Sequence, residues 1–305
     1  MPPGETTVKE VSILPYFALT ATFLFFGLSF VASKYALKSV PPLTLILLRF
    51  LLASLILGVL YFRKGRPPLA PGDRWRLSLL SLIVPGLYFL AETYGLKLSS
   101  ATSISLLIST IPIFASLLAF LILGEKVGIW RGAGIVLSIA GVGIIITSGE
   151  EGVQVGRIIQ VGNLLGLAAA VCAGLYMSLG RDLLSRYSPR VITTFQAFFT
   201  VALFLPLAGW EQIDYRWPEI NLLTIFAVIY LALFCSILAF FLWNYGISRL
   251  EASKAAVFTN LAPVFTVLGA YFFLGERIQL GQIIGGTLVI GGVSLASATR
   301  SRDSA

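Results

Sequence analysis

Histidine is absent from this chain of 305 residues, and charged residues make up only 12% of it. Without histidine, no Ser-His-Asp triad, Cys-His pair or HExxH zinc motif can form. Cysteine is scarce as well, and Cys172 and Cys235 both lie inside apolar runs, which predicts neither a disulfide framework nor a metal site. A GxxxxGK[ST] phosphate loop is also missing. The sequence therefore predicts no enzyme, no metal and no cofactor.

Apolar residues, by contrast, make up 57% of the chain, which leaves too little polar surface to cover a soluble protein of this size. A helix needs about 20 apolar residues to cross the roughly 30 Å of hydrocarbon in a bilayer. We therefore predict an all-α integral membrane protein, surrounded by lipid, with ten transmembrane helices. The predicted spans are residues 12–33, 41–62, 77–97, 101–123, 128–147, 161–180, 191–210, 221–246, 252–274 and 279–298.

The formal charge of +8 would point to nucleic acid as a partner if the protein were soluble. Here the basic residues lie between the apolar runs, where they indicate orientation instead. With the amino terminus in the cytoplasm, 15 lysines and arginines fall inside, 6 fall outside and Arg49 lies within a span. We therefore expect no nucleic-acid partner, a location in the plasma membrane and both termini in the cytoplasm.

The second half of the chain repeats the first. When the sequence is shifted by 151 positions, 15 of the 50 aligned residues from 94 to 143 are identical, and Pro112 falls on Pro263. A shift of 147 aligns the earlier part more weakly and places Arg49 on Gln196. A duplication is the simplest explanation.

The duplicated units are predicted at residues 12–147 and 161–298, with five spans each. Because five is an odd number, the second unit enters the membrane from the opposite side. Inverted repeats of this kind are typical of secondary transporters, in which a central site opens to one face and then to the other. The alternative is that duplication merely builds a stable helical bundle.

Three stretches carry a resemblance to a known family: FVASKYALKSVPPLTLILLRFLLA, ISTIPIFASLLAFLILGEKV followed by GAGIVLSIAGVGII, and NLAPVFTVLGAYFFLGERI followed by GGTLVIGGVSL. Together they resemble the EamA-type transporters of the drug/metabolite transporter superfamily. The resemblance covers nearly the whole chain. It implies a fold of five plus five helices and export of amino acids or related metabolites from bacterial cytoplasm, and it names no substrate.

Two charged residues lie within predicted spans. A lone cation such as Arg49 is costly there, so it should face protein or water, either bonding backbone carbonyls or binding a substrate carboxylate. Glu92 is the one acid well inside a span, where burial suits it to proton coupling unless a basic neighbour keeps it ionised. Helix rise places the two at similar depth, so we predict that they form an ion pair.

Polar residues also flank the two repeat-related prolines. Pro112 and Pro263 fall near the middle of spans four and nine, where we predict hinges, because each proline removes a backbone hydrogen bond. One turn earlier lie Ser109 and Asn260, which we predict to face each other and line the transport cavity. The alternative is that they only satisfy the kinks. Aromatic walls are expected from Tyr88, Tyr176 and Trp243.

Glycines and acids mark the helices that follow. Glu125 and Glu276 precede spans five and ten, where a carboxylate is expected to cap the N-terminus of the following helix. Gly134 and Gly141, like their repeat counterparts, are spaced seven residues apart, which favours close helix packing.

The favoured function is therefore export of amino acids or similar metabolites by alternating access. A carrier of sugars, nucleotide sugars or phosphorylated metabolites would need two or more basic residues converging inside the bundle, and only Arg49 qualifies. An intramembrane enzyme or an ion channel is less favoured, because neither paired catalytic acids nor a ring of repeated charges is found.

The topology can be tested with hydrophilic thiol probes in a background that lacks Cys172 and Cys235. Single cysteines at Gly65 and Ser185 should be labelled only from the cytoplasm, and one at Gly152 only from outside. Labelling of Gly65 and Gly152 from the same side would contradict the predicted topology, since an even number of spans would then separate them.

Overall fold

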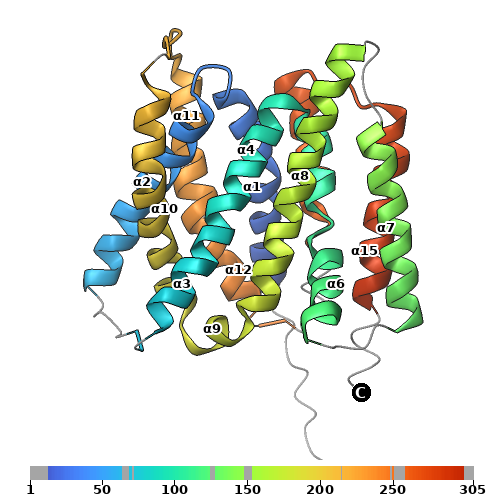
Figure 1. Ribbon diagram of the computed structural model, residues 1–305, viewed down its shortest axis with the longest axis horizontal. Helices are drawn as coiled ribbons and strands as arrows, with labels where there is room; N and C mark the ends of the chain where they lie inside the picture. The colour runs from blue at the N-terminus through green and yellow to red at the C-terminus, as the bar shows by residue number, and fades with distance from the viewer. Residues whose placement is uncertain are drawn as a thin grey trace, which may run out of the picture.

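The computed structural model describes residues 13–63, 69–70, 72–123, 128–147, 153–213, 215–247, 249–250 and 258–298. Every element of regular structure within these ranges is a helix, and the helices stand side by side in one bundle (Figure 1). The all-α class is therefore confirmed. Gly65, Glu125 and Gly152 lie outside the described residues.

Proline begins several of these helices. Pro15, Pro42 and Pro189 each lie in a first turn, where the fixed φ of proline suits a helix and its missing N–H has no helical partner to lose.

The α-helices are α1 (Leu14–Ala36), α2 (Pro42–Arg63), α3 (Asp73–Ser81), α4 (Tyr88–Leu98), α5 (Ala101–Ile108), α6 (Ile111–Leu123), α7 (Ile129–Thr147), α8 (Val153–Leu179), α9 (Arg181–Arg186), α10 (Pro189–Glu211), α11 (Leu222–Tyr230), α12 (Ala239–Ile247), α14 (Leu261–Gly269) and α15 (Leu280–Ala298). Three π-helical segments join some of them: η1 (Leu82–Leu87), η2 (Leu231–Leu238) and η3 (Ala270–Leu274).

Eight helical runs within the described residues are long and apolar enough to cross a membrane, from Leu14–Ala36 to Leu222–Trp243. Two shorter apolar helices, Leu261–Leu274 and Leu280–Ala296, follow where the last two spans are predicted. These helices make the chain a multi-pass membrane protein. The count of ten spans stays a prediction.

The bundle has two ends, which Figure 1 shows as upper and lower. Helices α2, α5 and α11 begin at the upper end, whereas α3 and α10 begin at the lower end, where α9 also lies. The lower end is the side predicted to face the cytoplasm.

The two halves pack by exchanging equivalent contacts. Helix α1 packs against α12 and α14, while its counterpart α8 packs against α4 and α6, the matching helices of the other half. Helices that correspond to each other under the repeat also pair directly, α2 with α10 and α7 with α15. This reciprocal packing is the pattern that two related halves produce when they meet around a pseudo-twofold axis.

Glycine lets α7 and α15 approach until their backbones touch. A Cβ on Gly141 would lie 2.5 Å from the carbonyl oxygen of Gly285, and a Cβ on Gly134 would lie 2.5 Å from that of Gly292. Both contacts need glycine, because a real Cβ is not found so close to another atom. The predicted close packing of these glycines is therefore confirmed.

The third span of each half is interrupted by a π-helical segment at the same place in the repeat. Segment η1 ends at Leu87 and η2 ends at Leu238, and these positions differ by the repeat shift of 151. Within η1, Val84 leaves the helical region altogether, with φ −137° and ψ 118°. Interruptions of this kind leave backbone carbonyls in need of other partners.

At the upper end, two carboxylates from the second half cap helices of the first half. Glu211 accepts hydrogen bonds of 3.1 and 2.8 Å from the first free N–H groups of α2, and Glu276 accepts bonds of 2.8 and 3.2 Å from those of α5. The prediction that Glu276 caps its own following span was wrong. The segment between η3 and α15 folds across the bundle, so its carboxylate reaches the neighbouring helix N-terminus instead.

At the lower end, an ion-pair network joins α3 of the first half to α9 of the second. Arg186 contacts Asp182 at 2.6 Å and Asp73 at 3.2 Å, and Arg76 contacts Asp182 at 3.2 Å. The Tyr187 hydroxyl donates a 2.7 Å hydrogen bond to Asp73. The hydrogen bond from Arg186, aided by the charges of Arg186 and Arg76, lowers the pKa of Asp182, so this acid is ionised at neutral pH.

We expect Gly141→Ala to destabilise the protein and Gly143→Ala to leave its stability equal or slightly higher. The methyl group at Gly141 would force α7 and α15 apart, which costs about 1–3 kcal/mol of stability. A Cβ at Gly143 meets nothing within 4 Å, and alanine is more favourable than glycine within a helix by up to about 1 kcal/mol. Thermal unfolding of both purified variants in detergent would measure the difference. Equal melting temperatures would contradict the close contact.

Candidate functional site

Arg49 lies at the centre of the site, on α2, with only 7% of its surface exposed. Its Nε donates a 2.8 Å hydrogen bond to the hydroxyl of Ser236 in η2. The guanidinium also lies over the ring of Phe89, with its central carbon 4.5 Å from the ring centroid. A hydroxyl and an aromatic face stabilise a cation only in part, and no described carboxylate forms an ion pair with this buried charge.

Glu92 follows Phe89 by one turn of α4 and is 3% exposed. Within the described residues, its Oε2 has no hydrogen-bond partner, and no ion pair joins it to Arg49. The predicted ion pair was therefore wrong, although the two charges interact through space. The structure thus holds a cation and a carboxyl group close together, each with unused bonding capacity.

The partners of Arg49 and of its repeat counterpart Gln196 are also related by the repeat. Gln196 on α10 donates a 2.8 Å hydrogen bond to the carbonyl of Val84 in η1 and a 3.1 Å bond to the Tyr176 hydroxyl. Ser236 and Val84 occupy neighbouring positions once the 151-residue shift is applied. The second span of each half therefore bonds the interrupted third span of the other half.

The three aromatic residues predicted for the site lie in different surroundings. Tyr176 on α8 accepts the hydrogen bond from Gln196, and Tyr88 on α4 packs edge to face on Phe89, with ring centroids 5.0 Å apart. Trp243 on α12 packs edge to face on Phe23 of α1, at 5.5 Å. Tyr88 therefore lies beside Phe89, the residue that contacts Arg49, and Tyr176 contacts Gln196 directly. Trp243 instead packs between α12 and α1.

Ser109 and Asn260 are not bonded to each other. The Ser109 hydroxyl donates to the carbonyl of Leu106 at 2.6 Å, and the Asn260 amide donates to the hydroxyl of Ser294 on α15 at 3.0 Å. Helices α5 and α14 do pack together, as expected of spans four and nine. A role for this pair in the transport path stays a prediction.

The two predicted hinge prolines follow helix interruptions instead of kinking a continuous helix. Helix α5 ends at Ile108 and α6 begins at Ile111, so Pro112 lies in the first turn of α6. Pro263 likewise lies in the first turn of α14. A proline in the first turn of a helix removes no helical hydrogen bond, because the first N–H groups of a helix have no partner within it. Movement at either proline stays a prediction.

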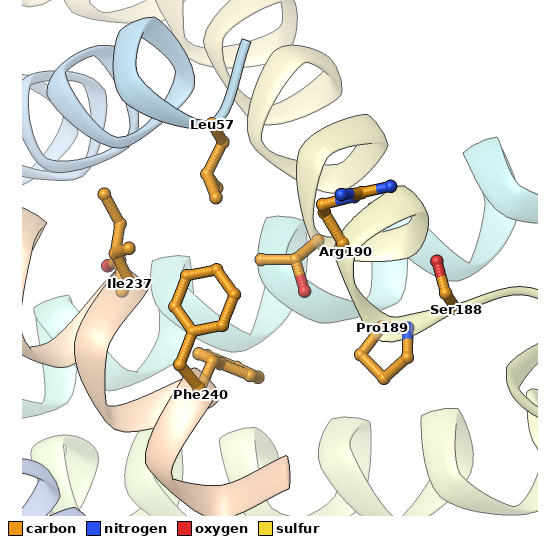
Figure 2. Close-up of a pocket in the computed structure, with 9 residues that line it drawn as sticks. Leu57, Ser188, Pro189, Arg190, Ile237 and Phe240 are labelled. Atoms are coloured by element: carbon orange, nitrogen blue, oxygen red, sulfur yellow. The ribbon is translucent and has the colours of Figure 1, made fainter. Parts of the chain in front are cut away.

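A cavity of about 320 Å³ lies beside this site, between α2, α10 and the η2–α12 run (Figure 2). Ser188, Pro189 and Arg190 line it at the start of α10, and Ser236 lines it in η2. Figure 2 shows Leu57, Ile237 and Phe240 along its apolar wall. The cavity therefore lies between the start of α10, at the lower end, and Ser236, the residue that bonds Arg49.

Ser236, Phe89 and the interruption at Val84 escaped the sequence-based prediction. Pro85-Gly86 inside span three was the available signal for the interruption, because proline removes a backbone donor there. A serine or a phenylalanine in an apolar run gives no comparable signal. Within the described residues, no group of three or more histidine, cysteine, aspartate or glutamate side chains could hold a metal ion.

The sequence matches the EamA-like transporter family twice, over residues 13–147 and 160–298. It is 31% identical over 292 residues to the uncharacterized transporter YetK of Bacillus subtilis, covering 95% of this chain and 88% of that protein. An uncharacterized transporter of Archaeoglobus fulgidus is also 31% identical, over 92% of this chain and 96% of the relative. A protein of Streptantibioticus cattleyicolor named as a probable terminal-alkyne amino-acid exporter is 27% identical, over 91% of each chain.

A crystal structure that is 21% identical in sequence has the same fold, with a TM-score of 0.65 over 96% of this chain and 99% of that one. At this identity the likeness concerns the fold alone. The two family matches and the long alignments with named transporters carry the assignment further. This chain belongs to the EamA-like transporter family, as a multi-pass membrane transporter.

Proposed function

We propose that this protein is a secondary transporter of the plasma membrane that exports amino acids or similar small metabolites by alternating access, with both termini in the cytoplasm. The relative named as a probable amino-acid exporter supports the substrate class. The inverted repeat supports the mechanism, because two related halves can expose one central site to either face in turn.

The observation that carries the proposal is that Arg49 and Glu92 are both buried and form no ion pair with each other. Arg49 and Glu92 are 7% and 3% exposed, lie close enough to interact through space, and form no ion pair with each other. An amino acid carries a carboxylate for the guanidinium and an ammonium for the free Oε2 of Glu92. Binding such a zwitterion would therefore satisfy both groups at once, in surroundings where an unpaired charge is costly.

The same carboxyl group would serve proton coupling. A carboxyl group buried in apolar surroundings holds a proton at lower cost than a charge, and an arriving ammonium group reverses that preference. Exchange of a proton for the substrate at Glu92 would then tie transport to a pH gradient, without any ATP-hydrolysing site.

Transport into proteoliposomes, with a panel of labelled amino acids and with or without a pH gradient, would test this proposal. We expect Glu92→Gln and Arg49→Gln each to slow transport by roughly 10-fold to 150-fold, because a charge-assisted hydrogen bond is worth about 1.5–3 kcal/mol. Glu92→Gln should also abolish stimulation by the gradient.

Glu219→Gln provides a matched control, since Glu219 is exposed in the loop before α11. It should transport at the normal rate. Unchanged transport by both Glu92→Gln and Arg49→Gln would refute a substrate site at these charges, and the absence of any amino-acid transport by the unmodified protein would refute the substrate class.

A further inference from the structure

The 320 Å³ cavity between α2, α10 and the η2–α12 run differs from the Arg49–Glu92 site in its chemistry. Leu57, Ile237 and Phe240 give it an apolar wall, and among its described lining residues Arg190 is the only charged one. Its volume lies at the lower end of the range of about 300–1,000 Å³ that small-molecule sites occupy. Such a cavity suits a small, mostly apolar solute that carries negative charge.

Ser236 connects this cavity to the buried cation. Ser236 lines the cavity, and its hydroxyl accepts the 2.8 Å hydrogen bond from Arg49 Nε while it donates to the Leu231 carbonyl at 3.0 Å. No other hydrogen bond from the guanidinium is found within the described residues, and no carboxylate lies within ion-pair distance of it. A carboxylate that reached Ser236 would therefore meet a cation whose present partner is a neutral hydroxyl.

A carboxylate would displace that hydroxyl. A hydrogen bond between two charged groups is about twice as strong as one between neutral groups, and guanidinium can bind both carboxylate oxygens together. Gln196, at the equivalent position of the other half, carries no charge and is already bonded to Val84 and Tyr176. The site therefore offers strong binding to one anionic group and not to two.

From these contacts we propose that the cavity is the loading site at the lower end, and that it takes solutes with one carboxylate and an apolar remainder, such as leucine or phenylalanine. The carboxylate moves past Arg190 and takes the place of the Ser236 hydroxyl on Arg49, while the apolar part of the solute packs against Leu57, Ile237 and Phe240. This inference rests on the proposed transport function and names the substrate class within it.

Equilibrium dialysis can test the proposal by measuring the binding of labelled L-leucine to the full-length protein in detergent. Unlabelled 4-methylpentanoate, which keeps the carboxylate and the apolar chain, should displace leucine, whereas L-leucinamide, which lacks the carboxylate, should not. L-Glutamine should bind on the order of tenfold or more weakly, because its side chain is polar. Equal binding of leucine and glutamine, or displacement by leucinamide, would overturn the proposal.

Two substitutions test the location. Ile237→Trp fills the cavity and should weaken leucine binding by on the order of tenfold or more, whereas Ile225→Trp, on exposed surface of α11, should not. Ser236→Ala removes the competing hydroxyl and should tighten binding by roughly 2-fold to 13-fold. Unchanged binding in Ile237→Trp, with its melting temperature close to that of Ile225→Trp, would show that the cavity is not the loading site.

The two proposals fail in different ways. If leucine binds as described but no amino acid crosses the proteoliposome membrane, the proposed transport function is wrong and the cavity stands only as a leucine-binding site. If Ile237→Trp transports leucine at the normal rate, the transport function stands and the loading site is wrong.

Discussion

A lipid bilayer offers no water to the backbone groups that an interrupted helix sets free, so each interruption must find its hydrogen-bond partners inside the protein. In this protein the third span of each half is interrupted, at η1 and at η2, and in each case a side chain from the second span of the other half bonds the interrupted segment. Gln196 bonds a backbone carbonyl of η1 directly, whereas Arg49 bonds the Ser236 hydroxyl, which itself donates to the Leu231 carbonyl within η2. The crossed bonds therefore make the two halves depend on each other at the depth where a transported solute would have to bind.

The two crossed bonds differ in one respect that duplication alone does not explain. Gln196 is neutral, and a carbonyl and a hydroxyl are adequate partners for its amide. Arg49 is charged, and one hydroxyl and the face of Phe89 leave most of its donors unused. A buried cation at this depth lowers stability. Reversible binding of an anion to Arg49 therefore explains the difference between Arg49 and Gln196 better than a contribution to stability does.

Hydropathy and repeat spacing could be predicted from the sequence, because both are patterns along the chain. The spans, the alignment of the halves and the contact of Gly134 and Gly141 with α15 all follow from periodic patterns. The pairing of Arg49 with Glu92 did not follow, because equal depth along two helices leaves the direction of each side chain open. Ser236 and Phe89 were the actual neighbours, and they lie within or just after a π-helical segment, where the regular α-helical period does not hold.

Repeat equivalence alone does not fix a side chain's hydrogen-bond partner. Ser109 and Asn260 occupy matching positions on helices that pack together, yet Ser109 bonds the Leu106 carbonyl in its own turn and Asn260 bonds Ser294 on α15. Gly141 and Gly285 lie on helices that do pair across the axis, and their backbones touch.

Different interactions hold the two halves together at the two ends of the bundle. At the upper end, Glu211 and Glu276 hold the starts of α2 and α5, and Gln212 bonds Thr44, so the second half is tied across the first. At the lower end, the ion pairs of Arg186 and Arg76 with Asp73 and Asp182 also join the halves, while the start of α10 has no side-chain cap and borders the cavity lined by Ser236. Opening toward the upper end would have to break the two carboxylate caps. The four backbone hydrogen bonds of these caps are worth about 1.5–3 kcal/mol each, which is more than the two that a zwitterion could form with Arg49 and Glu92, so substrate binding alone would not supply the free energy for such a change.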